Sequence, residues 1–255
     1  MRSHVKHIIA GVFLLLGGIT ANASAPYNLA DSGNAAYAKG NYAKAINMYS
    51  MFIDRGYESA NVYYNLGNCY YRTNDVAKAI LYYEKAKKLS PGDADILFNL
   101  QIANQKTIDK IAPESQLFFV NWWNNFVNTA SEKGWAIICI VLFSVCLVLI
   151  IFYLLSPSVI VKKMSFWCAG FILALSLFSF ILARQQYRTA TAHDTAIVMS
   201  PTVTVKGSPT ENATQLFVVH EGAKVHIIKI NDNWIEIKLS NGNQGWVQAS
   251  DIAMI

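Results

Sequence analysis

The sequence has few charged residues, prolines and glycines, and each shortage excludes a class of protein. Asp, Glu, Lys and Arg make up 15% of the 255 residues, against roughly 25% in a soluble globular domain. With 6 Pro and 14 Gly, collagen-like and disordered chains are excluded. Hydrophobic residues make up 53% of the chain and mean hydropathy is +0.27. We therefore expect part of the chain to lie in lipid.

The sequence also lacks cysteine pairs, catalytic motifs and basic stretches. The four cysteines (Cys69, Cys139, Cys146 and Cys168) form no CxxC motif, and we interpret them as small apolar packing residues. No HExxH motif, phosphate-binding loop or His–carboxylate–nucleophile set is present, so we expect no catalysis, metal or cofactor. The net charge of +5 is spread along the chain without a basic stripe, which excludes a nucleic-acid-binding surface.

Residues 1–23 have the pattern of a secretory signal peptide. Arg2 and Lys6 precede an apolar run at residues 8–19, and Ala21-Asn22-Ala23 forms a small-x-small cleavage site. Twelve helical residues are too few to cross a hydrocarbon core of about 30 Å. We expect an exported chain that is cleaved after Ala23.

Two longer apolar runs predict a transmembrane hairpin. Residues 135–155 and 165–183 contain no charged side chain and have the length of a spanning helix. The loop at 156–164 carries Lys162 and Lys163, which suits a cytoplasmic position. With an exported N-terminus, both soluble parts should then lie on the outer side.

Residues 26–112 contain a repeat of 34 residues. Tyr42-Ala43-Lys44-Ala45-Ile46 aligns with Val76-Ala77-Lys78-Ala79-Ile80, and Gly33-Asn34 aligns with Gly67-Asn68. A 34-residue period of paired helices is typical of the tetratricopeptide repeat (TPR). The second copy resembles that family at eight positions, namely Tyr63, Leu66, Gly67, Tyr70, Ala79, Tyr83, Ala86 and Pro91. We expect an α-helical solenoid of about two and a half repeats, near the minimum for a stable stack.

The first helices of the repeats should line a concave groove for an extended peptide. Its expected residues are Asn34, Tyr37, Tyr64, Asn68, Tyr71, Arg72, Phe98, Ile102 and Lys106. Asn34 and Asn68 occupy the asparagine places of TPR clamps that bind a terminal carboxylate, but Ala30 and Phe98 stand at the lysine places. The amides should instead hydrogen-bond the peptide main chain. In the alternative interpretation, the tyrosines only pack helices together.

Residues 113–134 form an amphipathic aromatic collar ahead of the first span. Its aromatic residues recur at helical spacing and are Phe119, Trp122, Trp123 and Phe126. Such a helix suits the lipid headgroup layer. Docking against the repeats is the alternative, and the two arrangements are compatible.

Residues 190–255 have short β-type runs separated by turn residues, which predicts a small barrel. Asn241-Gly242 before Gly245-Trp246-Val247 indicates a hairpin. The segments Gly222-Ala223-Lys224-Val225 and Asn233-Trp234-Ile235-Glu236-Ile237 resemble a bacterial SH3 (SH3b) domain. The resemblance implies binding of cell-wall peptide or protein. Strand alternation puts Trp234 and Glu236 on one face, the candidate ligand face, although we favour the interpretation of Trp234 as an ordinary rim aromatic.

The sequence therefore predicts a multidomain membrane protein with a TPR solenoid, a transmembrane hairpin and an SH3-like barrel. This order, with Leu117-Phe118-Phe119-Val120-Asn121-Trp122-Trp123 before Gly134-Trp135, resembles the BatE family of Bacteroides aerotolerance (Bat) proteins. The resemblance implies a bacterial inner-membrane protein with both soluble domains in the periplasm. It also implies Bat-type partners with von Willebrand A domains, a MoxR-type ATPase, and a role in aerotolerance or envelope stress. A non-catalytic adaptor is the leading hypothesis, and a cell-wall sensor that binds peptidoglycan through the SH3b domain is the alternative.

Overall fold

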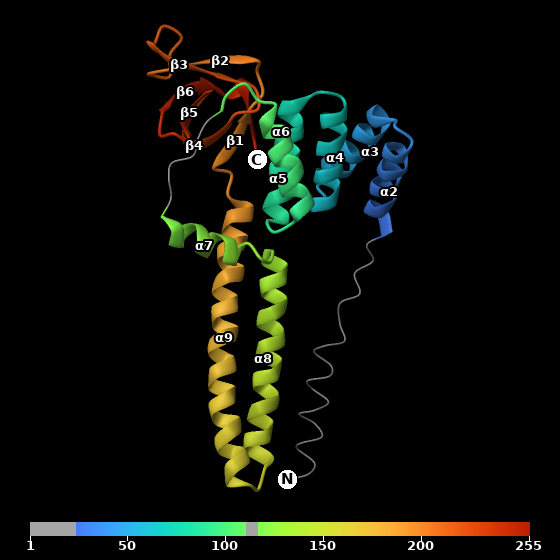
Figure 1. Cartoon of the computed structure of the whole chain (residues 1–255), viewed down its shortest axis with the longest axis vertical. Helices are drawn as coiled ribbons and strands as arrows, with labels where there is room; N and C mark the ends of the chain where they lie inside the picture. The colour runs from blue at the N-terminus through green and yellow to red at the C-terminus, as the bar shows by residue number, and fades with distance from the viewer. Residues whose placement is uncertain (1–23, 111–116) are drawn as a thin grey trace.

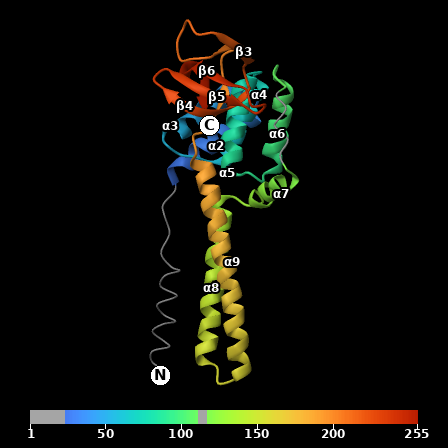
Figure 2. The same cartoon turned by 90° about the vertical axis from the view of Figure 1, so that its left-hand side faces the viewer.

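The computed structural model describes residues 24–110 and 117–255, and the predicted signal peptide at residues 1–23 lies outside them. The described residues form a block of short helices, a long two-helix hairpin and a β-sheet domain (Figure 1). The helical block and the β-sheet domain lie at the same end of the hairpin in both views (Figures 1 and 2). The fold class expected from the sequence is thus confirmed.

Paired antiparallel helices form the repeat region. They are α2 (Ser24–Ala38), α3 (Tyr42–Asp54), α4 (Ala60–Arg72), α5 (Val76–Leu89) and α6 (Ala94–Gln105). The N-cap residues Asn41 and Asp75 are 34 positions apart, and each side chain accepts a hydrogen bond from the third residue of its helix at 3.1 Å. The 34-residue repeat of the sequence is therefore also present in the structure, because α3 and α5 begin at equivalent positions of successive repeats.

Glycine is required where the two helices of a repeat cross. A Cβ atom at Gly33 would lie 2.4 Å from the Tyr49 ring, and one at Gly67 would lie 2.6 Å from the Tyr83 ring. Tyr49 and Tyr83 are both fully buried. The close approach of the helices thus depends on the absence of a side chain at these two positions.

The hairpin consists of α8 (Glu132–Leu155) and α9 (Val159–Thr191), and both helices are long and apolar enough to cross a membrane. Ser179 Oγ donates to the main-chain oxygen of Trp135 at 2.8 Å, and Ser176 Oγ donates to that of Cys139 at 3.1 Å. These small polar side chains let the two backbones approach closely.

The connection between the two long helices is shorter than the loop predicted at residues 156–164. Only residues 156–158 connect the helices, because Pro157 cannot continue α8 while residues 159–164 contain no helix breaker. The helix α9 also continues to Thr191, well past the apolar run that ends at residue 183.

The C-terminal domain is an antiparallel seven-stranded sheet in the order β3-β2-β6-β5-β4-β1-β7. Its strands are β1 (Thr195–Val198), β2 (Thr202–Lys206), β3 (Gln215–His220), β4 (Lys224–Asn231), β5 (Trp234–Leu239), β6 (Gln244–Gln248) and β7 (Ile252–Met254). Along β5, Ile235, Ile237 and Leu239 are buried while the residues between them are partly exposed. This alternation encloses one apolar core inside the curled sheet.

The β-sheet domain packs directly against the repeats, although the sequence predicts two modules separated by the hairpin. Ile197 of β1 and Ile255 share one buried cluster, here called the docking interface, with α5 and α6 residues that include Ile80, Leu100 and Ala103. All four residues of β1 are buried, because this strand faces the barrel core on one side and the helices on the other. The sheet therefore covers the open end of the incomplete third repeat.

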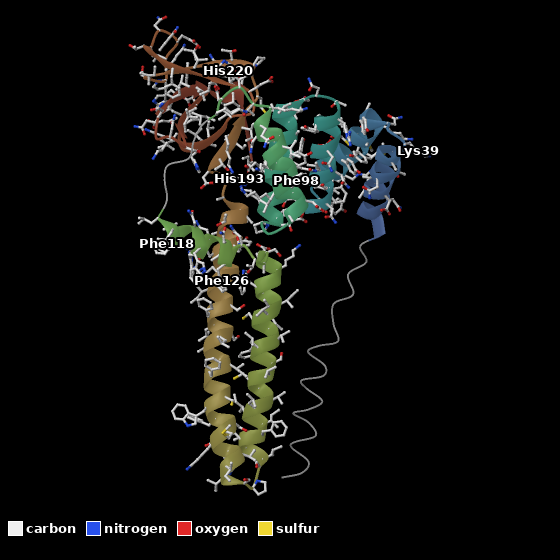
Figure 3. All side chains as sticks on the ribbon, in the orientation of Figure 1. Lys39, Phe98, Phe118, Phe126, His193 and His220 are labelled. Atoms are coloured by element: carbon white, nitrogen blue, oxygen red, sulfur yellow. The ribbon has the colours of Figure 1, made fainter. Side chains whose placement is uncertain are left out.

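Polar contacts border the docking interface. Lys224 Nζ lies 2.7 Å from Glu84 Oε2, and Glu84 is buried. The main-chain N–H of His220 donates to Asp109 Oδ2 at 2.6 Å, and its ring Nδ1 lies 2.9 Å from Asp109 Oδ1. Figure 3 marks His220 in the β-sheet domain. These contacts fix the orientation of the sheet on the repeats.

Replacing Ile197 by alanine should loosen the docking interface, because truncation of a buried isoleucine costs about 2–5 kcal/mol. Val198→Ala is the matched control, since Val198 is equally buried but faces the barrel core. Hydrogen exchange of the full chain in detergent should be faster in α5 and α6 for Ile197→Ala. Val198→Ala should accelerate exchange in the strands, and equal acceleration of α5 and α6 by both variants would contradict the assignment of the two faces.

Candidate peptide-binding groove

The inner face of the repeats contains a cavity of about 300 Å³. Its lining residues come from α2, α4, α5 and α6 and are Tyr37, Tyr64, Asn68, Tyr71, Arg72, Tyr83, Asn99 and Ile102. We call this cavity the groove. Six of the residues expected from the sequence, namely Tyr37, Tyr64, Asn68, Tyr71, Arg72 and Ile102, lie together in it.

Three other expected residues lie outside the lining of the groove. The Lys106 Nζ is 4.1 Å from the centre of the Tyr71 ring, so Lys106 sits at the rim. Phe98, marked in Figure 3, is 61% exposed on α6. Asn34 is exposed on α2 and makes the hydrogen bonds described next. Sequence reasoning missed Tyr83 and Asn99, although both follow the 34-residue period from Tyr49 and Asn65.

A repeated set of hydrogen bonds, here called the amide ladder, lies beneath the groove. Asn34 Oδ1 accepts from Tyr49 Oη at 2.7 Å and from Asn65 Nδ2 at 2.9 Å. One repeat later, Asn68 Oδ1 accepts from Tyr83 Oη at 2.7 Å and from Asn99 Nδ2 at 3.0 Å. Each asparagine thus joins the second helix of its own repeat to the first helix of the next one.

The amide ladder changes the role of the two asparagines. Their oxygens are occupied by the fold and are not available to a peptide, contrary to the expectation that both amides simply face a ligand. Within residues 24–110 and 117–255, Asn68 Nδ2 makes no hydrogen bond, so this donor remains for a ligand. Burial raises the pKa of Tyr49 to about 12 and also raises that of Tyr83, which keeps both phenols protonated as ladder donors.

The groove has a cationic rim over an aromatic floor. Arg72 and Tyr37 both line the groove, and the interaction with the Tyr37 phenol raises the pKa of the Arg72 guanidinium. Arg72 and Lys106 are 34 residues apart and thus occupy the same place in successive repeats. The lining of the groove includes no carboxylate. The site suits an extended segment that brings main-chain carbonyls to Asn68 and negative charge to the rim.

The second candidate face, at Trp234 and Glu236 of β5, is partly occupied by the chain itself. Lys206 Nζ lies 5.0 Å from the centre of the Trp234 ring and 2.8 Å from Glu211 Oε2. Gln248 Nε2 donates to Glu211 Oε1 at 2.7 Å. Both Trp234 and Glu236 are only partly exposed. This arrangement favours the interpretation of Trp234 as a rim aromatic.

The described part of the collar contains α7 (Phe118–Val127), which lies across the end of the hairpin (Figure 1). Phe126 packs on Phe178 and Trp135, while Trp135 Nε1 donates to the Val127 oxygen at 2.9 Å. Figure 3 shows Phe126 beside the hairpin and Phe118 at the far end of α7, where it is 83% exposed. The collar is therefore fixed to both long helices while its outer aromatic residues remain uncovered.

Comparison with protein families identifies two domain types. Residues 30–94 match the tetratricopeptide repeat family, and residues 200–253 match the bacterial SH3 domain family. No curated protein matches the chain. Both families are typically non-catalytic binding domains, and among the described residues no group of three His, Cys, Asp or Glu side chains could hold a metal ion. The class of protein is thus a binding or adaptor protein with two long apolar helices.

Removal of one ladder asparagine should destabilise the repeats. Asn68→Ala leaves the buried Tyr83 hydroxyl without its acceptor, which should cost about 1–3 kcal/mol of unfolding free energy. Asn104→Ala is the control, because Asn104 is an exposed residue on α6. Denaturant unfolding of the full chain measures both changes, and equal midpoints for the two variants would show that the ladder contributes nothing to stability.

Proposed function

We propose that the protein is a membrane-anchored adaptor whose repeats bind an extended segment of another envelope protein. The tyrosine-lined groove with its Arg72 and Lys106 rim carries this proposal. A TPR domain supports protein partners, and the free Asn68 amide together with a cationic rim suits a peptide main chain that carries acidic groups. At the alternative face, Lys206 Nζ lies 5.0 Å from the centre of the partly exposed Trp234 ring.

We further propose that the chain acts as a BatE-type protein of the bacterial inner membrane. Its partners would be Bat-type membrane proteins with von Willebrand A domains, working with a MoxR-type ATPase in aerotolerance or envelope stress. The order of domains along the sequence supports this proposal. A groove held close to the bilayer by the hairpin also suits partners that are themselves in the membrane.

Both soluble parts are proposed to lie in the periplasm. A hairpin returns the chain to the side from which it entered, and the signal-like residues 1–23 favour export. A bacterial SH3 domain is also consistent with a location outside the cytoplasm.

The second candidate function is a cell-wall sensor, favoured by the match of residues 200–253 to the bacterial SH3 domain. In that case peptidoglycan fragments would bind the β5 face at Trp234 and Glu236. Lys206 would then have to leave the Trp234 ring, since it now covers part of that ring.

Site-specific crosslinking in the full-length protein tests the adaptor function. A photoreactive residue at Ile102, inside the groove, should capture a membrane protein, while one at the exposed Gln101 of the same helix should not. Tyr71→Ala should reduce the Ile102 adduct about 5- to 150-fold, by loss of a 1–3 kcal/mol contact. Trp234→Ala should leave it unchanged. Loss of the adduct with Trp234→Ala but not with Tyr71→Ala would favour the sensor.

Fusion to a phosphatase that is active only outside the cytoplasm tests the orientation. Fusions after residue 110 and after residue 255 should be active, and a fusion within residues 156–158 should be inactive, because the hairpin places this connection on the other side. Activity at one end of the chain only would rule out the hairpin topology.

A further inference from the structure

A second cavity, of about 480 Å³, lies where the repeats, the hairpin and the β-sheet domain meet. It is bounded by the C-terminal end of α5, the last turns of α9 and the strands β1 and β4. Asn128, which follows α7, also lines it. We call it the membrane-proximal cavity. It is separate from the groove, which lies on the inner face of the repeats.

The membrane-proximal cavity has an excess of positive charge. Four cations line it, Lys87, Lys88, Arg188 and Lys224, together with His226. Its two carboxylates are Glu84 and Asp194, so the lining carries a net charge of +2 when His226 is neutral.

Two of the four cations lack a partner of their own. Lys224 is paired with Glu84 at 2.7 Å, and Lys88 donates to the main-chain oxygens of Ala192 and Ile255. Within the described ranges, the side chains of Lys87 and Arg188 make no ion pair or hydrogen bond. Burial lowers the pKa of Lys88, with Asp194 opposing the shift and Lys224 and Lys85 adding to it. Burial thus disfavours the charged form of Lys88, and an anion bound beside it would stabilise that charge.

The depth of the cavity matches the headgroup layer of a bilayer. Gln186, another lining residue, donates to the Val127 oxygen and to Asn128 Oδ1, both at 3.0 Å, and so ties the cavity to the collar. The apolar run of α9 ends at residue 183, and Arg188 follows about 7.5 Å further along the helix. Each polar layer of a bilayer is roughly 5–7.5 Å thick. Arg188 therefore lies where lipid phosphates are found.

We propose that the membrane-proximal cavity binds the phosphate of an anionic phospholipid from the bilayer that the hairpin spans. Lys87 and Arg188 supply the two unpaired cations, approaching the phosphate from α5 and α9. Guanidinium and ammonium groups form charge-assisted hydrogen bonds with phosphate oxygens. The bound lipid would link the repeats to the hairpin through its headgroup. This inference needs the hairpin to lie in a membrane but does not depend on the groove or on its peptide.

Titration of the full-length protein with phosphatidylglycerol tests the proposal. Native mass spectrometry of the protein in detergent measures the dissociation constant, with phosphatidylcholine as the neutral lipid. The wild type should bind phosphatidylglycerol more tightly than phosphatidylcholine. The double variant Lys87→Gln/Arg188→Gln should weaken phosphatidylglycerol binding about tenfold or more, since hydrogen bonds to charged groups are worth about 1.5–3 kcal/mol.

The control variant is Lys39→Gln/Arg55→Gln. It removes one lysine and one arginine from exposed positions on the first repeat, so its change in net charge is the same. Lys39 lies at the far side of the repeats from the cavity (Figure 3). This variant should bind phosphatidylglycerol like the wild type, and circular dichroism should show that both variants are folded.

Three results would overturn the proposal. Equal weakening in both variants would mean that lipid is attracted by net charge alone. Equal binding of the two lipids by the wild type would mean that no headgroup charge is recognised. Binding of inorganic phosphate to the wild type with the same affinity as phosphatidylglycerol would identify a soluble anion, and not a lipid, as the occupant.

Discussion

The arrangement of the whole molecule depends on the docking interface between the repeats and the β-sheet domain. Ile197 belongs to β1, a strand that is buried on both faces. The strand therefore contributes side chains both to the barrel core and to the helical core. A stack of two and a half repeats has few neighbour contacts of its own. The sheet supplies the apolar cover that a further repeat would otherwise provide. The two domains are therefore one unit, and fragments cut between them would expose a core surface.

The amide ladder explains how a short solenoid keeps a defined groove. Asn34 and Asn68 each connect three helices through one side-chain oxygen. In each case the donors are a buried tyrosine of the same repeat and an asparagine from the first helix of the next repeat. Hydrogen bonds of this kind are satisfied only in one helix register, since a slip would leave buried polar groups unpaired. Stability and binding thus share the same residues, which leaves the Asn68 nitrogen and the cationic rim for a ligand.

Most of the fold could be predicted from patterns among residues that are close together in the sequence. The 34-residue period, the two apolar runs and the alternation in β5 each follow from burial with a fixed helix or strand spacing. The docking interface was not predictable, because Glu84 and Lys224, or Asp109 and His220, are ordinary polar residues far apart in sequence. For the groove, spacing placed six of the nine expected side chains in the lining of the cavity. It could not reveal that the asparagine oxygens are used internally, since that depends on where Tyr83 and Asn99 point.

The helix α5 is the element through which the proposed sites are connected. Tyr83 donates to Asn68 at the groove, and the next residue, Glu84, pairs with Lys224 of the β-sheet domain. One turn later, Lys87 and Lys88 line the membrane-proximal cavity. Residues within two turns of a single helix thus border the groove, contact the β-sheet domain and line the membrane-proximal cavity. If the hairpin spans a membrane as proposed, this helix would hold the groove at a fixed height above the bilayer, within reach of proposed partners in the same membrane.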